Sequence, residues 1–160
     1  MKQIKDAYNR LEAMAKKMDG QANRNARAVL AKLDQIIKNG KVEMASAELL
    51  KSTKNLVPTM YDYSRGVLVV TPTFLSSEPN RQLLNLYHEG LHALLKQAKT
   101  RMQDEINTWK YTMQFYRSFS FITQTAFTDM EALIKAEDES EAAFEKAIRE
   151  KYKGAFGVTE

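Results

Sequence analysis

The chain lacks cysteine altogether and contains only two histidines among its 160 residues. Without cysteine there can be no disulfide framework, no thiol nucleophile, no iron–sulfur cluster and no zinc site built on thiolates. Any chemistry that needs an imidazole must therefore use His88, His92 or both.

Long apolar runs are missing as well. No stretch approaches the roughly 20 apolar residues that span a bilayer, and the run from Val67 to Val70 has the length of a strand. The first 17 residues carry charges throughout and contain no apolar core of a secretory signal peptide. We therefore expect a cytoplasmic protein without a membrane partner.

The composition fits one globular domain. Hydrophobic residues make up 44% of the chain, which is enough to bury a core, and the net charge is only +4. Residues 1–58 carry a net charge of +6 and residues 126–160 one of −4, so the two ends could attract each other. Aromatic residues are not interleaved with the basic ones, so we do not expect nucleic acid as a partner.

Apolar spacing predicts helices over most of the chain. A helical stripe runs from Ile4 to Met18, with Gly20 where a C-terminal cap would lie, and a second runs from about Asn23 to the stop at Asn39 and Gly40. Further helices are expected over 45–52, from the Ser76 to Pro79 start signal to about 98, over 104–121, and over 129–152 as one or two helices.

A short segment between these helices has the composition of a sheet. Residues 55–73 are rich in β-branched and aromatic side chains, and residues 66–71 form the clearest strand. The expected fold is a mainly helical α+β domain over residues 1–160. It would consist of N-terminal helices (1–54), a small antiparallel or mixed sheet followed by two helices (55–125), and an acidic helical tail (126–160).

Both histidines lie in the five-residue motif HExxH, formed by His88, Glu89, Gly90, Leu91 and His92. Residues four apart on a helix lie on one face, so two imidazoles can bind one zinc ion while Glu89 holds a water. Leu84, Leu91 and Leu95 share the stripe of His88, so the histidines are expected to point inward. Gly90 indicates a close approach, either of a backbone or substrate or of a packed helix.

Catalytic zinc usually has three protein ligands, and here the third must be a carboxylate because no other histidine or cysteine exists. The acids within reach are Asp104 and Glu105. Helical phase places Glu105 near the apolar stripe of Trp109, whereas Asp104 points away and is expected to cap its helix. Glu105 is therefore the predicted third ligand, with Asp104, Asp129 or Glu131 as alternatives if the second helix docks differently.

HExxH followed by Glu105 on a second helix resembles the gluzincin pattern of zinc metallopeptidases. The small size, and a strand just before the motif helix, are similar to minigluzincins and ImmA/IrrE-type peptidases in particular. The likeness covers residues 67–116, a third of the chain, although the interval of 13 residues from His92 to Glu105 is shorter than is common in those families. It implies a zincin-like domain.

The mechanism implied is hydrolysis of a peptide or protein substrate, with Zn²⁺ on His88, His92 and Glu105 and with Glu89 as general base. The strand Val67–Val70, if it forms the edge of the sheet, could bind an extended peptide. Since no third histidine exists, a tyrosine is the expected oxyanion donor. The candidates are Tyr111 and Tyr116 on the second helix and Tyr61 and Tyr63 in the sheet region.

Two other functions fit the same residues. The chain could be a non-catalytic or latent zincin-like regulatory or binding module that uses its basic N-terminal helices to hold a partner. Those helices could also be a segment that covers the cleft, in which case truncation near Lys54 would release activity.

Overall fold

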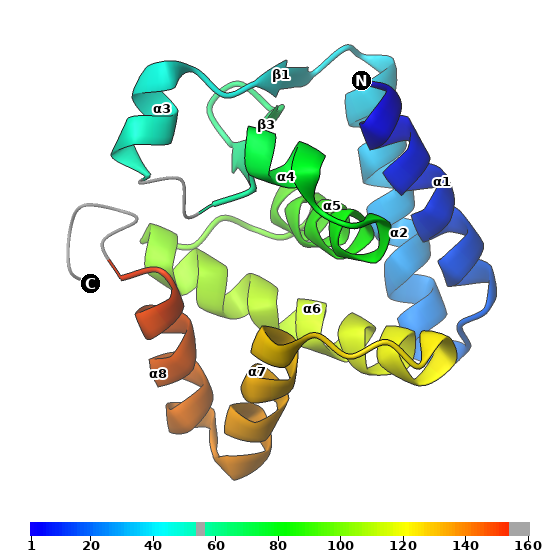
Figure 1. The fold of residues 1–160 in the computed structure, drawn as a ribbon, viewed down its shortest axis with the longest axis vertical. Helices are drawn as coiled ribbons and strands as arrows, with labels where there is room; N and C mark the ends of the chain where they lie inside the picture. The colour runs from blue at the N-terminus through cyan, green and yellow to red at the C-terminus, as the bar shows by residue number, and fades with distance from the viewer. Residues whose placement is uncertain (54–56, 154–160) are drawn as a thin grey trace.

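The computed structural model describes residues 1–53 and 57–153, and Figure 1 shows their arrangement. It confirms the expected mainly helical α+β fold. Lys54 and Asn55, two of the expected boundaries, lie outside the described residues. The elements are α1 (Lys2–Lys16), α2 (Gly20–Lys38), β1 (Val42–Met44), α3 (Ala47–Ser52), β2 (Thr59–Asp62), β3 (Val67–Val70), α4 (Pro72–Ser76), α5 (Pro79–Leu94), α6 (Arg101–Thr123), α7 (Thr128–Glu139) and α8 (Glu141–Lys151).

Helices α1 and α2 lie side by side and pack against α5 (Figure 1). Their apolar stripes are buried, and they belong to the same hydrophobic core as the other helices. Gly20 does not cap α1 as expected. It is the first residue of α2 and has a φ of 57°, a conformation that a glycine adopts without strain.

The sheet is mixed, with β3 between β1 and β2. β1 runs parallel to β3 with Val42 opposite Leu68, and β2 runs antiparallel to it with Thr59 opposite Val70. Val67–Val70 is therefore not an edge strand, so the condition for binding a peptide along it is not met. The reason for the difference is that β1 was not predicted. That strand has three residues, two of them exposed, and so lacks the apolar alternation by which a strand is recognised.

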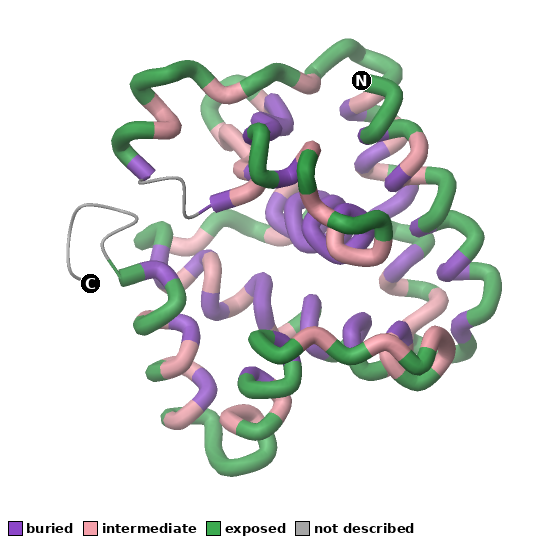
Figure 2. The backbone as a smooth tube through the Cα atoms, in the orientation of Figure 1, coloured by how far each residue is buried: buried purple, intermediate pink, exposed green. Residues whose placement is uncertain are grey.

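Helix α5, which carries the HExxH motif, lies at the centre of the molecule and is buried along most of its length (Figure 2). It begins at Pro79, and its N-terminal cap is the side chain of Glu78, which accepts a hydrogen bond of 2.8 Å from the Arg81 amide. The hydroxyls of Ser76 and Ser77, expected to cap this helix, donate instead to the carbonyl of Thr73.

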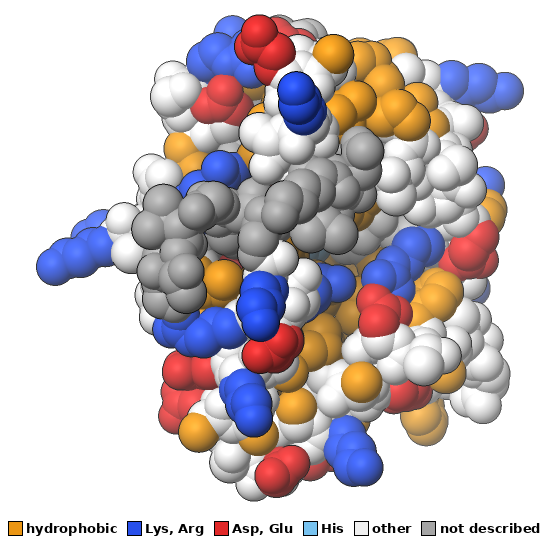
Figure 3. All heavy atoms as spheres, turned by 60° about the vertical axis from the view of Figure 1, so that its left-hand side comes forward, with side chains coloured by type: hydrophobic (Ala, Val, Ile, Leu, Met, Phe, Trp, Pro, Cys, Tyr) orange, Lys and Arg blue, Asp and Glu red, His pale blue; other side chains and the backbone are white. Residues whose placement is uncertain are grey.

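Helix α6 is 23 residues long and packs across α5, while α7 and α8 pack on α6. The charge of the acidic tail suggested an attraction to the N-terminal helices, whereas the ion pairs that join its described residues to other elements are with α5 and α6. These ion pairs join Asp129 to Arg81, Glu141 to Lys110, and both Glu137 and Asp138 to Arg117. In agreement, acidic and basic side chains are interspersed on the lower part of the face in Figure 3.

Within the described ranges, no helix combines the length and the apolar character needed to cross a membrane. The long helix α6 carries Asp104, Glu105, Lys110 and Arg117 along its length. The buried helix α5 carries both histidines and Glu89. The motif residues and Glu105 therefore lie on two helices that pack against each other, α5 and α6.

Candidate metal centre

The two histidines of α5 meet Glu105 of α6 at a single point. His88 Nε2 lies 3.0 Å from one carboxylate oxygen of Glu105, and His92 Nε2 lies 3.0 Å from the other. The two Nε2 atoms are 3.2 Å apart. All three side chains are largely buried, with 6%, 5% and 13% of their surface exposed. The grouping expected from the sequence is therefore present in the fold.

These distances fit a metal ion of the size of zinc. Tetrahedral ligands with bonds of about 2.0–2.1 Å lie about 3.3 Å from one another. The three groups, His88, His92 and Glu105, therefore already have nearly the spacing that such an ion requires, and each offers one ligand atom to a common centre. Thus the donor set fits the metal that the HExxH motif indicates.

A hydroxyl on α6 determines which nitrogen of His88 carries the proton. Thr112 Oγ1 donates its hydrogen to the carbonyl of Thr108, at 3.0 Å, and lies 2.8 Å from His88 Nδ1. Because that hydroxyl has no second proton, it can only accept a hydrogen bond from Nδ1–H. The lone pair of His88 is therefore on Nε2, which faces the common centre.

The carboxylate of Asp104 holds a proton on Nδ1 of His92, as the Thr112 hydroxyl does for His88. Its Oδ2 lies 2.8 Å from His92 Nδ1, and its Oδ1 accepts a hydrogen bond of 3.1 Å from the Ala98 amide. Asp104 is 6% exposed and does not cap α6 as expected, because the cap is Thr100, whose hydroxyl accepts from the Gln103 amide. The position of Glu105 agrees with the expected helical phase. The position of Asp104 does not, because its side chain contacts His92 and the Ala98 amide just before α6.

The charges around the centre are unbalanced without a cation. Burial alone would raise the pKa of Glu105, but the imidazoles of His92 and His88 hold it below its ordinary value. Burial lowers the pKa of His88, whereas the carboxylates of Glu105 and Asp104 outweigh burial and raise the pKa of His92. A proton on His92 thus offsets one of these two carboxylate charges in the absence of a metal, and a metal ion would replace that proton.

Glu89 is buried beside this centre and has an unsatisfied oxygen. Its Oε2 is the one buried side-chain nitrogen or oxygen, among the described residues, that has no hydrogen-bond partner. Burial raises the pKa of Glu89 to about 7, helped by the charge of Glu105 and opposed by His92 and a hydrogen bond from Thr59. A carboxyl with a pKa near neutrality can both accept and return a proton.

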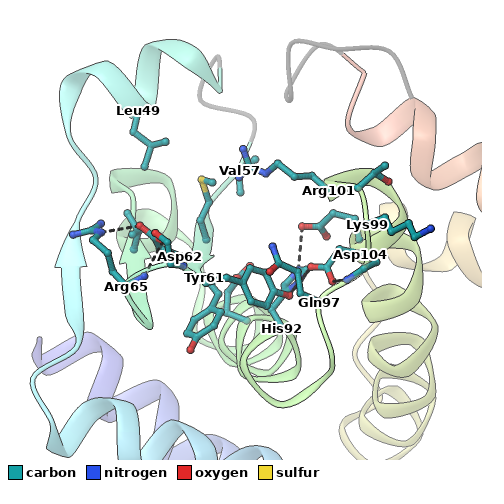
Figure 4. Close-up of a pocket in the computed structure, with 18 of the residues that line it drawn as sticks. Leu49, Val57, Tyr61, Asp62, Arg65, His92, Gln97, Lys99, Arg101 and Asp104 are labelled. Carbon is teal, nitrogen blue, oxygen red and sulfur yellow. Dashed lines mark hydrogen bonds and ion pairs between the residues drawn. The ribbon is translucent and has the colours of Figure 1, made fainter.

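Glu89, His92 and Glu105 line a cavity of about 580 Å³, drawn in Figure 4. Side chains of α3 and β2, including Leu49 and Tyr61, form one side, and the start of α6 forms the other. No residue of α1 or α2 lines this cavity. Helices α1 and α2 pack on another face of α5, whereas Leu49 of α3, the third of the expected N-terminal helices, lines the cavity, so release of activity by truncation near Lys54 stays a prediction.

The structure separates the four candidate tyrosines. Tyr116 is fully buried, and its hydroxyl accepts a hydrogen bond of 2.9 Å from the Phe127 amide, while Tyr111 is 41% exposed. Neither lines the cavity, so neither is placed there to serve as the expected oxyanion donor. Tyr61 and Tyr63 do line it.

The alternative carboxylate ligands lie elsewhere. Asp129 is bound by the guanidinium of Arg81, with Nη1 and Oδ1 2.9 Å apart, and Glu131 is exposed on α7. Neither belongs to the group formed by His88, His92 and Glu105. Among the described residues, only that group has its ligand atoms close enough for a shared ion.

Thr112 was not predicted as part of the site, and neither was the contact of Asp104 with His92. A signal for Thr112 existed: Glu105, Thr108 and Thr112 are spaced at i, i+3 and i+7, which puts three polar groups on one face of a helix that is otherwise apolar there. Both threonines are buried, at 1% and 0% exposure. Asp104 had no such signal, because its contact depends on the loop between α5 and α6.

Comparisons of the chain with models of protein families, with curated proteins and with solved structures found no match.

Proposed function

We propose that the protein is a zinc-dependent metallopeptidase that hydrolyses peptide bonds with Glu89 as general base. The observation that carries the proposal is the convergence of three acceptor groups, His88 Nε2, His92 Nε2 and the Glu105 carboxylate, within 3.0–3.2 Å. Thr112 and Asp104 hold the Nδ1 protons of the two imidazoles, so both Nε2 lone pairs face inward. The resemblance of residues 67–116 to gluzincins points the same way.

Zinc held by these residues would lower the pKa of a bound water toward 7 and polarise the carbonyl of the scissile bond. Glu89 supplies the proton transfer. Its unpartnered Oε2 accepts the proton of the attacking water, and the same oxygen then gives that proton to the departing amine nitrogen. The pKa of about 7 suits both transfers at neutral pH.

An extended peptide fits the cavity as substrate. β2 pairs with β3 along one edge, and its residues Met60, Tyr61 and Asp62 line the cavity beside Glu89. A peptide that adds to the sheet along β2 would bring its backbone past Glu89 and the metal ligands. β2 would thus bind the peptide in the way that was expected of Val67–Val70.

The first test is metal content together with a Glu89→Gln variant. Purified wild-type protein should contain about one zinc per chain and hydrolyse an unfolded protein substrate. Glu89→Gln removes the base but none of the ligands, so zinc content should stay the same while the rate falls about 10²–10⁴-fold. Zinc is measured by elemental analysis and hydrolysis by the release of new amino termini.

Glu131→Gln is the matched control, since it makes the same chemical change on the exposed face of α7 and should leave both readings unchanged. A wild-type protein that folds without metal and takes up none would overturn the proposal. So would a Glu89→Gln variant that hydrolyses at the wild-type rate. If zinc binds and Glu89→Gln leaves the biological function intact, the non-catalytic module is the better description.

A further inference from the structure

Tyr63 lies in the turn between β2 and β3, and its side chain reaches the metal centre from the sheet. The ring packs edge-on against Tyr61, with centroids 5.2 Å apart, and edge-on against the imidazole of His92 at 6.2 Å. Its hydroxyl lies 2.5 Å from Asp104 Oδ2 and 3.1 Å from His92 Nδ1. Through this one oxygen, Tyr63 links the sheet to His92 of α5 and to Asp104 of α6.

The protons around His92 Nδ1 can be assigned one by one. The Tyr63 hydroxyl donates its proton to Asp104 Oδ2. Thr108 Oγ1, 3.3 Å from Nδ1, donates its proton to the Asp104 carbonyl. All three oxygens around Nδ1 are therefore acceptors, and the proton between them must belong to His92.

We propose that Tyr63 is a positioning residue that holds Asp104 and His92 in the arrangement that binds the metal. It is not the oxyanion donor that the sequence suggested, because its one proton is already given to Asp104. The inference rests on the proposed function, since it assigns Tyr63 to the zinc ligand His92. Through Asp104, Tyr63 fixes the proton on Nδ1 and keeps the lone pair of Nε2 toward the common centre.

The test is the zinc affinity of Tyr63→Phe, measured by competition with a chromogenic chelator. The variant keeps the ring and its packing but loses the hydroxyl. Asp104 can then turn away from His92, so we expect the dissociation constant for zinc to rise about tenfold. The absorption bands of the cobalt-substituted protein should shift as well, because they report the geometry of the ligands themselves.

Tyr61→Phe is the matched control. Tyr61 lines the same cavity, lies two residues away and touches the ring of Tyr63, but its hydroxyl is not among the hydrogen-bond partners of His92 Nδ1 or Asp104 Oδ2. Its removal should leave the zinc affinity and the cobalt spectrum unchanged. Asp104→Asn serves as a second variant, since its one carbonyl oxygen cannot replace both carboxylate oxygens, of which Oδ2 accepts from His92 and Tyr63 and Oδ1 from the Ala98 amide. It should weaken zinc binding at least as much as Tyr63→Phe.

The outcomes separate this inference from the proposed function. If wild type binds zinc and hydrolyses peptides while Tyr63→Phe binds zinc like Tyr61→Phe, the inference is overturned and the function stands. If wild type binds zinc without hydrolysing peptides and Tyr63→Phe binds it more weakly, the function falls and the inference stands. A wild type that binds no zinc overturns both.

Discussion

Thr112 has an unusual task for a threonine inside a helix. Its hydroxyl donates to the carbonyl one turn earlier, as threonines in helices often do, and then accepts from His88 Nδ1 with its remaining lone pair. Since the residue is fully buried, no water can replace it in that place. The orientation of His88, a proposed zinc ligand, therefore depends on a side chain that is not itself one of the three proposed ligands.

Replacing Thr112 with Val should weaken zinc binding about 10–100-fold, because His88 loses the acceptor that fixes its ring. The buried Nδ1–H left without a partner should also lower the free energy of unfolding of the metal-free protein by about 1–3 kcal/mol. Chelator competition and urea denaturation measure the two effects.

Thr123→Val is the control on the same helix, where the hydroxyl makes the same bond to the carbonyl four residues earlier, at 2.8 Å, far from His88. It should leave zinc affinity unchanged. Equal zinc affinities for Thr112→Val and Thr123→Val would contradict the assignment.

The tyrosines illustrate which single residues could not be placed in advance. Tyr111 and Tyr116 share a helix with Glu105, which made them reasonable oxyanion donors. In the structure Tyr111 is exposed to solvent, and the hydroxyl of Tyr116 accepts a hydrogen bond from the Phe127 amide. Tyr63 lies 41 residues from Asp104 in sequence. The hydrogen-bond partner of a tyrosine hydroxyl cannot be inferred from its neighbours in sequence, because that partner depends on how the helices and strands pack together.

Gly90 explains how closely α2 and α5 approach each other. A Cβ atom at this position would lie 2.6 Å from Val29 Cγ1 and 3.0 Å from Leu33 Cγ, both on α2. Of the two explanations that the sequence left open, helix packing accounts for the glycine. Gly90 lies between His88 and His92 in the motif, so this packing also sets the depth at which α5 carries both histidines.

Gly90→Ala should destabilise the protein although alanine favours helices by about 1 kcal/mol over glycine. Val29 is β-branched and fully buried, so it cannot turn aside, and overpacking of this kind costs about 1–3 kcal/mol. Zinc affinity should fall too, because α5 must move. The measurements are urea denaturation and chelator competition.

The double variant Val29→Ala, Gly90→Ala makes room for the new methyl group. The double variant should therefore lose less free energy of unfolding than the sum of the losses in the two single variants. A Gly90→Ala variant more stable than wild type would show that α2 can move away from α5.

Helices were easier to anticipate than the order of the strands. Apolar stripes and turn residues placed α1, α2, α5 and α6 within a few residues of their observed bounds, because those signals are local. The strand β1 and the short helix α4 had no such pattern. Missing β1 had a further consequence, since it made the central strand β3 look like an edge.

The metal centre joins the two helices on which the rest of the molecule is assembled. α1, α2 and α4 pack on α5, whereas α7 and α8 pack on α6. α8 also reaches toward the site, where the hydroxyl of Tyr152 accepts a hydrogen bond of 2.8 Å from Trp109, whose ring lies 4.4 Å from that of His88. An ion shared by α5 and α6 would therefore stabilise the fold as a whole.

Zinc should accordingly raise the thermal unfolding temperature of the entire chain. At free zinc about 1,000 times the dissociation constant, binding to the native state alone adds about 4 kcal/mol to the free energy of unfolding. Scanning calorimetry at several free zinc concentrations measures the shift. The variant His88→Ala, His92→Ala should unfold at one temperature whatever the zinc concentration, and a zinc-dependent shift in that variant would place the ion elsewhere.

The sequence by itself determined the local part of this site. Helical geometry puts residues 88 and 92 on one face, and the lack of cysteine and of further histidine left a carboxylate as the remaining ligand. Only the tertiary structure decided that Asp104, Thr112 and Tyr63 hold the two imidazoles, and that β3 is central. The reason is physical: spacing within one helix follows from its covalent and hydrogen-bonded geometry, whereas contacts between elements follow from the packing of the whole core, which no local pattern contains.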